Sequence, residues 1–523
     1  MVVGRFLAAS AWPAAFRTPA GRGGDSAMHA LLVYPEFPDT FWSFKHALRF
    51  VRKQSSTPPL GLLTVAAMLP PAWDLRLVDT NVQALTDADL AWADCVLVSA
   101  MAVQRPSVDR IVARCRDAGR TVIAGGPLFT AQPEQFGAVD HLVLNEAELT
   151  LPAFLRDFAA GRAQRIYRSA EFADLTRTPI PRWDLVRLSR YASMPLQYSR
   201  GCPFDCDFCD VTAQLGHRPR IKAAGQVIAE LDRLYDLGWR GGVFFVDDNL
   251  IGNKRNVKRE LLPALIEWRR GRRGLSFGTQ ASINLADDAA LMDLMTRAGF
   301  DTVFVGIETP SAGALAECSK KQNLNRDLVA DTRRLQRAGL QVQGGFILGF
   351  DSDSEAAPQR LADFIQKSGI VMAMVGLLQA LPGTRLHERM RKAGRLVVGG
   401  SGDNVDGTTN IVPLAGGDGL REAYRDLLGR LYAPKAYYRR VRALLREYRP
   451  PRIKGRIDPG YLRQQALACA RSVVRLGIAG RERVEYWKLI AWTIVRRPRL
   501  LPMAVTLAIY GYHFRMITEL HIA

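Results

Sequence analysis

The sequence predicts an α/β protein with an N-terminal Rossmann-like domain, a central partial (β/α)6 barrel and a C-terminal basic, mainly helical domain. Three observations predict this organisation. The chain has 523 residues, which is too long for one ordinary hydrophobic core. Two series of short apolar runs alternate with helical patterns, and the chain then becomes strongly basic.

The first series of apolar runs lies in residues 28–161. Five runs, "HALLVYP", "WDLRLVD", "DCVLVSA", "RTVIAGG" and "DHLVLNE", are separated by helical patterns such as "LGLLTVAAML" and "PSVDRIVARCRDAG". This alternation is typical of parallel strands covered by helices, in domains that bind ligands at the carboxyl ends of the strands. Because no GxGxxG follows the first run, a dinucleotide site is disfavoured. Residues 1–27, Arg-rich and nearly free of acids, predict a disordered leader or a mis-assigned start.

A second series of runs occupies residues 192–398, after a polar, proline-containing stretch at 162–191 that we predict to be a linker. Its six strand candidates are "MPLQYS", "GGVFFVDD", "LSFGTQAS", "DTVFVGIE", "VQGGFILGF" and "VMAMVGLLQA". Six β/α units suit an open, partial barrel better than the full eight-unit barrel, and both place reactive groups at the carboxyl ends of their strands.

The last region, residues 399–523, reads as basic helices without strand signals. From Arg421 onward it has 22 Lys and Arg against 7 Asp and Glu, so it carries most of the net charge of +20. Two apolar stretches are divided by "RRPR", and we expect neither to reach the roughly 20 residues needed to span a bilayer. With Trp487, Trp492, Tyr510 and Tyr512, the region suits either an anionic membrane surface or a helical cap packed on the barrel. Nucleic acid is disfavoured because no nucleic-acid fold accompanies the charge.

Three of the seven cysteines, Cys202, Cys206 and Cys209, stand within the stretch "SRGCPFDCDFCD" directly after a predicted strand. The seven show no paired spacing, which disfavours a disulfide scaffold and indicates a reducing, cytoplasmic compartment. Structural zinc prefers four ligands, and the nearest other cysteine in sequence is Cys115. Three thiolates on one loop instead suit an iron–sulfur cubane that keeps one iron open.

The motif "CPFDCDFC" on the loop after the first strand of a six-unit β/α region resembles that of the radical S-adenosylmethionine (radical SAM) superfamily. The resemblance implies a [4Fe-4S] cluster held by Cys202, Cys206 and Cys209. It also implies that the methionine part of SAM chelates the fourth iron and that Phe208 lies beside the adenine.

Later strand ends fall where that superfamily keeps its other SAM contacts. In "FFVDDN", Asp247 and Asp248 stand where the family often has a Gly-Gly-Glu that holds the methionine amine; a helix N-cap pair is the alternative. The other implied SAM contacts are Gln280, Ser282, Glu308 and Gly345.

The first domain resembles the cobalamin-binding branch of the superfamily, because "PPLGLLTVAAML", "VIAGGPLFT" and "LNEAELTLPAF" occur in the order seen there. The implied cobalamin contacts are Pro59, Leu60, Gly61, Gly125 and Gly126. The DxHxxG motif is absent, which implies a cobalt without a protein histidine ligand; a vestigial domain without cobalamin is the alternative. Methylthiotransferases are disfavoured because the first domain offers only Cys95 and Cys115 for a second cluster.

Taken together, these motifs resemble the cobalamin-dependent radical SAM (class B) methyltransferases of the hopanoid C-2 methyltransferase type. The resemblance implies methyl transfer to an unactivated carbon of a hopanoid-like lipid, with a flavodoxin or ferredoxin as electron donor and a peripheral position at the inner membrane. A peptide or a specialised metabolite is the alternative substrate. A corrin- or metal-binding regulator with a basic nucleic-acid-binding tail is the non-enzymatic alternative.

Overall fold

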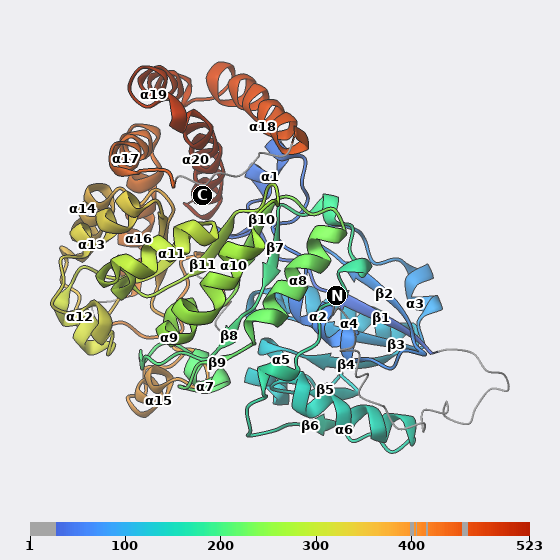
Figure 1. Ribbon diagram of the computed structural model, residues 1–523. Helices are drawn as coiled ribbons and strands as arrows, with labels where there is room; N and C mark the ends of the chain where they lie inside the picture. Colours follow the sequence, from blue (N-terminus) through green and yellow to red (C-terminus); the bar gives the residue numbers. More distant parts are fainter. Residues whose placement is uncertain (1–27, 398–401, 404, 415–416, 452–458, 523) are drawn as a thin grey trace.

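The computed structural model describes residues 28–397, 402–403, 405–414, 417–451 and 459–522; the leader predicted for residues 1–27 lies outside them. Two parallel sheets lie beside each other, and the C-terminal helices stack against the second sheet and the start of the first domain (Figure 1).

The first sheet has six parallel strands in the order β2-β1-β3-β4-β5-β6. The strands are β1 (His29–Tyr34), β2 (Asp74–Asp79), β3 (Cys95–Ser99), β4 (Thr121–Gly125), β5 (His141–Val143) and β6 (Ile166–Tyr167). The five predicted strands are confirmed. The sixth lies in the stretch that the sequence predicts as a linker, where a two-residue strand leaves no periodic pattern to detect.

Helices cover both faces of this sheet, as the alternation predicts. One face packs against α3 (Asp87–Trp92), α4 (Arg105–Asp117) and α5 (Pro127–Ala131), the other against α2 (Leu60–Met68) and α6 (Ala147–Ala159). The short α1 (Lys45–Val51) instead packs against the C-terminal helices.

The second sheet contains all six strands that the sequence predicts for a partial barrel, in the open order β14-β13-β12-β11-β10-β7. The strands are β7 (Ser193–Leu196), β10 (Gly242–Phe245), β11 (Phe277–Gln280), β12 (Phe300–Glu308), β13 (Gln341–Leu348) and β14 (Ala373–Leu377). The helices of this region are α7 (Val211–Leu215), α8 (Ala224–Asp236), α9 (Lys254–Asn256), α10 (Leu262–Trp268), α11 (Ala289–Ala298), α12 (Ala312–Glu317), α13 (Leu328–Ala338), α14 (Ala357–Ser368) and α15 (Arg385–Lys392).

The two sides of the barrel strands differ in burial. In β12, Val303, Val305 and Ile307 are fully buried, whereas the alternate residues Phe304 and Gly306 are only half-buried. Since side chains alternate across a strand, the apolar set packs under the helices and the other set faces the inside of the barrel. The barrel interior is therefore the less filled side.

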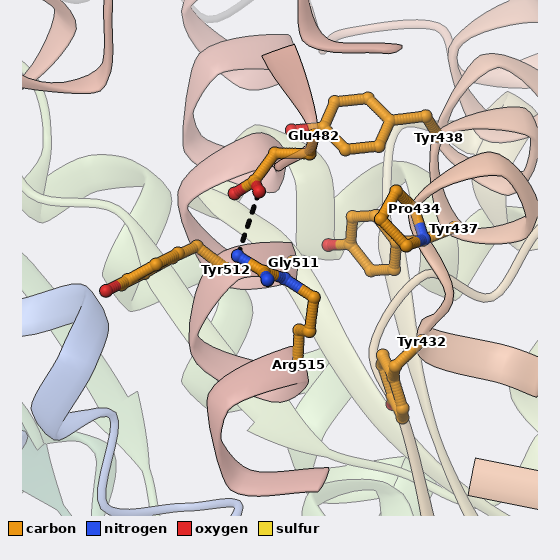
Figure 2. Close-up of a pocket in the computed structure, with 8 residues that line it drawn as sticks. All are labelled: Tyr432, Pro434, Tyr437, Tyr438, Glu482, Gly511, Tyr512 and Arg515. Carbon is orange, nitrogen blue, oxygen red and sulfur yellow. Dashed lines mark hydrogen bonds and ion pairs between the residues drawn. The ribbon is translucent and has the colours of Figure 1, made fainter. Parts of the chain in front are cut away.

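The C-terminal region is helical, as predicted, with α16 (Gly417–Tyr432), α17 (Pro434–Glu447), α18 (Pro459–Ser472), a π-helical turn (Val473–Ile478), α19 (Arg483–Arg496) and α20 (Leu501–Ile522). Helix α20 contacts α16, α17, α18, α19 and α1. An ion pair fixes it to the start of α19, because Arg515 lies 2.8 Å from Glu482 among the rings of Tyr437, Tyr438 and Tyr512 (Figure 2).

One helical stretch among the described residues, Pro498–Leu520, is long and apolar enough by length and composition to cross a membrane, and half of it is buried inside the protein. The expectation that no apolar half reaches such a length is therefore wrong for this stretch, because the helix continues past Tyr512 through Arg515. Its packing is that of a core helix. Tyr510 and Tyr512, for which the sequence left a membrane surface and a packed helical cap open, contact Phe44 and Phe50 of the first domain.

Candidate functional site

The cysteine loop lies between two short antiparallel strands, β8 (Ser199–Arg200) and β9 (Arg220–Ile221), at the carboxyl end of β7. Gly201 has a φ of 93°, and a Cβ there would lie 2.8 Å from the Gly216 carbonyl oxygen. The amide of Cys202 donates to that same carbonyl at 3.2 Å. Only glycine fits this turn, which aims the loop across the mouth of the barrel.

The three cysteines of the loop are half-buried free thiols, whereas Cys95, Cys115 and Cys318 are fully buried. Burial raises the pKa of all three loop thiols, and that of Cys209 to about 12, while the charge of nearby Lys320 lowers it. No group of three His, Cys, Asp or Glu in the described part of the chain is placed to hold a metal ion. Three thiols on one loop match the number of ligands in an iron–sulfur cubane that keeps one iron open.

Helix α15, which follows the last strand of the barrel, contacts this loop. The amide of Leu386, in α15, donates to the carbonyl of Asp207 at 2.9 Å, and the Arg389 guanidinium lies 2.9 Å from the Asp207 carboxylate. Phe208 packs in the small apolar cluster beside them. Helix α15 and the segment before it, residues 381–392, therefore fix the position of the cysteine loop.

A buried ion pair faces the thiols. Lys320 Nζ lies 2.6 Å from Glu308 Oε1 and 5.8 Å from the centre of the Phe208 ring. Burial opposes the charge, but Glu308 and two neighbouring thiols together raise the pKa of Lys320 above its usual value. Glu308 has a φ of 63°, a strained conformation for a residue with a side chain. The sequence pointed to Glu308 and missed Lys320, which follows α12 with no strand or motif around it.

The two predicted aspartates have different environments. Asp247 is fully buried and accepts hydrogen bonds from the amides of Tyr198 and Ser199 and from the Ser199 hydroxyl, so it braces the strand before the cysteine loop. Asp248 is only half-buried and influences the Cys202 thiol. Burial and the carboxylates of Asp247 and Asp210 raise the pKa of Asp248 to about 7. Asp248 is therefore the one of the pair whose charge acts on a thiol of the loop.

The two polar residues predicted at the end of β11 differ in their hydrogen bonding. The Ser282 hydroxyl donates to Asn284 at 2.7 Å and accepts from Asn249 at 3.3 Å, so it belongs to a local network. Gln280 is half-buried and its side chain carries no hydrogen bond to the described residues. Gln280 is thus the better placed of the two to meet a ligand inside the barrel.

Gly345 lies deep in the barrel beside apolar side chains. A Cβ there would come within 2.8 Å of the Phe304 ring and 3.7 Å of Met374. Trp42, from the loop after β1, contacts both: its ring lies 5.4 Å from that of Phe304, and its Nε1 donates to the Met374 sulfur at 2.9 Å. The first domain therefore reaches into the barrel, and the sequence did not point to Trp42, Phe304 or Met374.

In the first domain, the predicted cobalamin residues lie on one edge of the sheet. Gly125 ends β4, and Gly126 follows with a φ of 91°, so close to Ser99 that a Cβ would lie 2.5 Å from its hydroxyl oxygen. Pro59, Leu60 and Gly61 form the start of α2, and a Cβ on Gly61 would meet open space. Because α2 follows β1, its start lies at the carboxyl edge that Gly125 also occupies.

Buried ion pairs join this edge to the cysteine loop. Glu146, beyond the end of β5, lies 2.8 Å from Arg200 and 2.9 Å from Arg220, and Arg200 also pairs with Glu148 at 2.8 Å. Arg200 stands two residues before Cys202. These ion pairs therefore hold the carboxyl edge of the first sheet beside the cysteine loop of the second. The sequence analysis missed these ion pairs because their partners lie far apart in the sequence.

Matches to known protein families correspond to the first sheet, the barrel and the C-terminal helices. The chain matches the B12 binding domain over residues 51–155, the radical SAM superfamily over residues 196–365, and a domain of unknown function (DUF4070) over residues 384–523. Fold and domain order therefore define a radical SAM enzyme with a cobalamin-binding domain.

Two relatives extend along nearly the whole chain. An uncharacterised methyltransferase of Synechocystis sp. is 39% identical over 94% of this chain and 92% of its own. The hopanoid C-2 methylase of Rhodopseudomonas palustris is 34% identical over 90% of each chain. The protein belongs to the cobalamin-dependent radical SAM methyltransferases, and membership implies a [4Fe-4S] cluster, SAM and cobalamin as cofactors.

Solved structures share the fold at low sequence identity. The cobalamin-dependent radical SAM enzyme OxsB, with aqua-cobalamin and SAM bound, has a TM-score of 0.60 at 15% identity and covers 95% of this chain and 80% of its own. The methyltransferase TsrM from Kitasatospora setae, with cobalamin and a [4Fe-4S] cluster bound, has a TM-score of 0.54 at 15% identity, over 71% of this chain and 79% of its own.

Proposed function

We propose that this protein transfers a methyl group to an unactivated carbon of a hopanoid-like lipid. The observation that carries the proposal is the similarity to hopanoid C-2 methylase, which extends over 90% of both chains. The bacteriochlorophyllide methyltransferases of Chlorobaculum tepidum match only 64% and 65% of this chain. Full-length likeness favours a shared substrate class over a shared cofactor chemistry alone.

The interior of the barrel supports an apolar substrate. Trp42, Phe304 and Met374 are partly exposed and form an apolar surface. Gly345 is buried beside this surface, next to Phe304 and Met374. Burying a flat hydrocarbon skeleton against such a surface is favourable in proportion to the apolar area removed from water. A hydrophilic peptide would gain less from it.

The cofactors are assigned to the cysteine loop and to the carboxyl edge of the first sheet. Cys202, Cys206 and Cys209 would hold the [4Fe-4S] cluster, and Asp248 and Lys320 suit the amine and carboxylate of SAM. The start of α2 and the turn at Gly125 and Gly126 would hold cobalamin. When bound, the cluster and SAM supply the radical that activates the carbon, and cobalamin carries the methyl group. The chain's own residues position these groups.

A one-electron donor such as flavodoxin or ferredoxin would reduce the cluster from outside the barrel. A pocket of about 830 Å³ lies beside the segment that follows the cysteine loop, lined by Phe172, His217, Arg218 and their neighbours. Its wall includes Gly216, whose carbonyl accepts from Cys202. Arg218 is exposed and has no carboxylate partner among the described residues, so it suits an acidic donor. Arg218→Glu should raise the donor concentration needed for half-maximal rate and leave dithionite-driven turnover unchanged.

The proposal is tested by anaerobic reconstitution with iron, sulfide and cobalamin, followed by incubation with SAM, dithionite and a hopanoid such as diploptene. Mass spectrometry should detect a hopanoid heavier by one methylene unit. A matched incubation with an open-chain triterpene should give none. If deoxyadenosine forms without any methylated hopanoid, the protein is a methyltransferase of another substrate, such as a peptide or a specialised metabolite.

A further inference from the structure

The outer side of the C-terminal domain is unusually apolar. Half of the exposed large apolar side chains in the described residues, eight of sixteen, lie between Leu462 and Val495. They are 45% to 76% exposed. A solvated helical surface normally presents polar residues on its outer side, and contiguous exposed apolar side chains mark interaction sites.

Helix α19 is apolar on two opposite sides. Its inner side buries Tyr486, Leu489 and Ile490. Its outer side exposes Val484, Trp487, Ile494 and Val495. Steps of three, seven and one residues keep all four on one side of a helix with 3.6 residues per turn, so they form one stripe. Packing within the domain explains the inner side only.

The stripe continues onto the preceding π-helical turn. The indole of Trp487 donates to the carbonyl of Gly477 at 2.9 Å, and a Cβ on Gly477 would lie 3.2 Å from the same ring. Ile478 follows directly and is 64% exposed. We call the set Val474, Ile478, Val484, Trp487, Ile494 and Val495 the outer apolar face.

Buried contacts hold this face outward. Arg515 of α20 pairs with Glu482 at the start of α19 (Figure 2), and the indole of Trp487 is held by its hydrogen bond to the Gly477 carbonyl. Ser472 and Tyr486 hydrogen-bond to each other at 2.9 Å beneath the face. These contacts fix α19 and the π-helical turn against α18 and α20. The apolar stripe therefore cannot rotate toward the inside of the domain.

Positive charge surrounds the outer apolar face. Residues 459–499 contain nine Lys and Arg against two Glu, a net charge of +7. Both glutamates are largely buried, and Arg483, Arg496 and Arg499 have no carboxylate partner among the described residues. A second copy of the chain would bring like charges together, and nucleic acid would leave the apolar stripe in water.

We propose that the outer apolar face docks on the surface of an anionic lipid bilayer. The apolar stripe would enter the boundary between headgroups and acyl chains, while the arginines bind lipid phosphates. The inference deepens the proposed function, because a membrane-resident lipid would then be delivered from the surface on which the enzyme lies. Docking itself needs no substrate, and it can be measured without turnover.

The test is flotation of the full-length protein with vesicles of phosphatidylcholine, with and without phosphatidylglycerol. Wild type should float with the anionic vesicles and remain unbound with the neutral ones. Ile478→Glu with Val484→Glu, and separately Arg483→Glu with Arg496→Glu, should each weaken binding by more than about tenfold. The matched control is Ile180→Glu with Val412→Glu, which alters two exposed apolar residues elsewhere and should bind like wild type.

Thermal unfolding of each variant separates lost docking from lost folding. Wild type that ignores anionic vesicles, or face variants that float as well as the control, would overturn the proposal. So would a wild-type dimer that Ile478→Glu converts to a monomer, because the face would then bind a second copy. Docking without hopanoid methylation would leave this inference standing and remove the proposed substrate.

Discussion

Two buried ion pairs, one in the barrel and one in the C-terminal domain, have nearly the same geometry and different surroundings. Lys320 lies 2.6 Å from Glu308, and Arg515 lies 2.8 Å from Glu482. Around Lys320 are the thiols of the cysteine loop and a strained backbone at Glu308. Around Arg515 are tyrosine rings and a space of about 10 Å³, room for about one water.

The difference separates a pair that faces ligands from one that fixes helices. A buried pair is weak evidence for stability, because the cost of desolvation offsets the attraction, but removal of one partner leaves an unpaired buried charge. The pair at Glu482 has no open space for a ligand and joins α19 to α20. The pair at Glu308 lies at a strand end in the mouth of a barrel, where function is concentrated in this fold.

The largest expected effect comes from removing a thiol beside Lys320. Cys206→Ala should lower deoxyadenosine formation to background, because the cluster loses one of three ligands. Iron and sulfide content should fall with it, while the thermal unfolding of the apoprotein stays close to wild type. The control is Cys318→Ala, a fully buried cysteine near the same loop that we expect to keep its cluster. Equal iron content in both variants would contradict the assignment of the loop.

The next largest effect tests the structural pair. Arg515→Met should destabilise the protein by about 3–5 kcal/mol, because Glu482 is left charged and buried. Urea unfolding measures this loss, and iron content per folded molecule should remain at the wild-type value. The matched control is Arg499→Met, an exposed arginine two residues before α20, which should change stability little. A variant that keeps its stability and loses its cluster would reverse the comparison.

Acid should weaken the same helical domain. Burial lowers the pKa of His513 to about 4, where it bonds the Phe41 carbonyl at 3.1 Å beside His46. The neutral imidazole therefore contributes stability that is complete above about pH 6.5 and is lost as the pH falls toward about 4, by at most about 3 kcal/mol. In His513→Gln, the unfolding free energy should depend less on pH over this window than in wild type. The control is His141→Gln, which should keep the wild-type pH dependence. Parallel curves for both variants would exclude His513 as the cause.

Apolar patterning predicted all six barrel strands and five of the six strands in the first sheet, because each run is long enough to show its period. It missed β6, which has two residues, and it underestimated α20, where "RRPR" marks the start of a helix that then runs to Ile522. Local pattern thus identifies elements well and their ends poorly.

The candidate site divides along another line. Motif spacing pointed to the cysteines, Asp248 and Glu308, since each stands at a strand end. Lys320, Arg200 and Trp42 escaped notice because their partners are 12, 54 and 332 residues away, and only the folded chain brings them together. Asp247 is the opposite case. Its strand-end position resembles that of a ligand contact, but its hydrogen bonds go to the amides of Tyr198 and Ser199 and to the Ser199 hydroxyl.

The smallest expected effect gives the sharpest test of the barrel pair. Lys320→Met removes a positive charge beside the thiols, so the reduced cluster, which carries one more negative charge, loses stabilisation relative to the oxidised one. The midpoint potential should fall by on the order of tens of millivolts, given about 59 mV per tenfold change in a one-electron equilibrium. Redox titration followed by electron paramagnetic resonance measures it. Lys321→Met, an exposed neighbour, should leave the potential unchanged. If Lys320→Met instead lowers the unfolding free energy as Arg515→Met does and leaves the potential at its wild-type value, both pairs are structural.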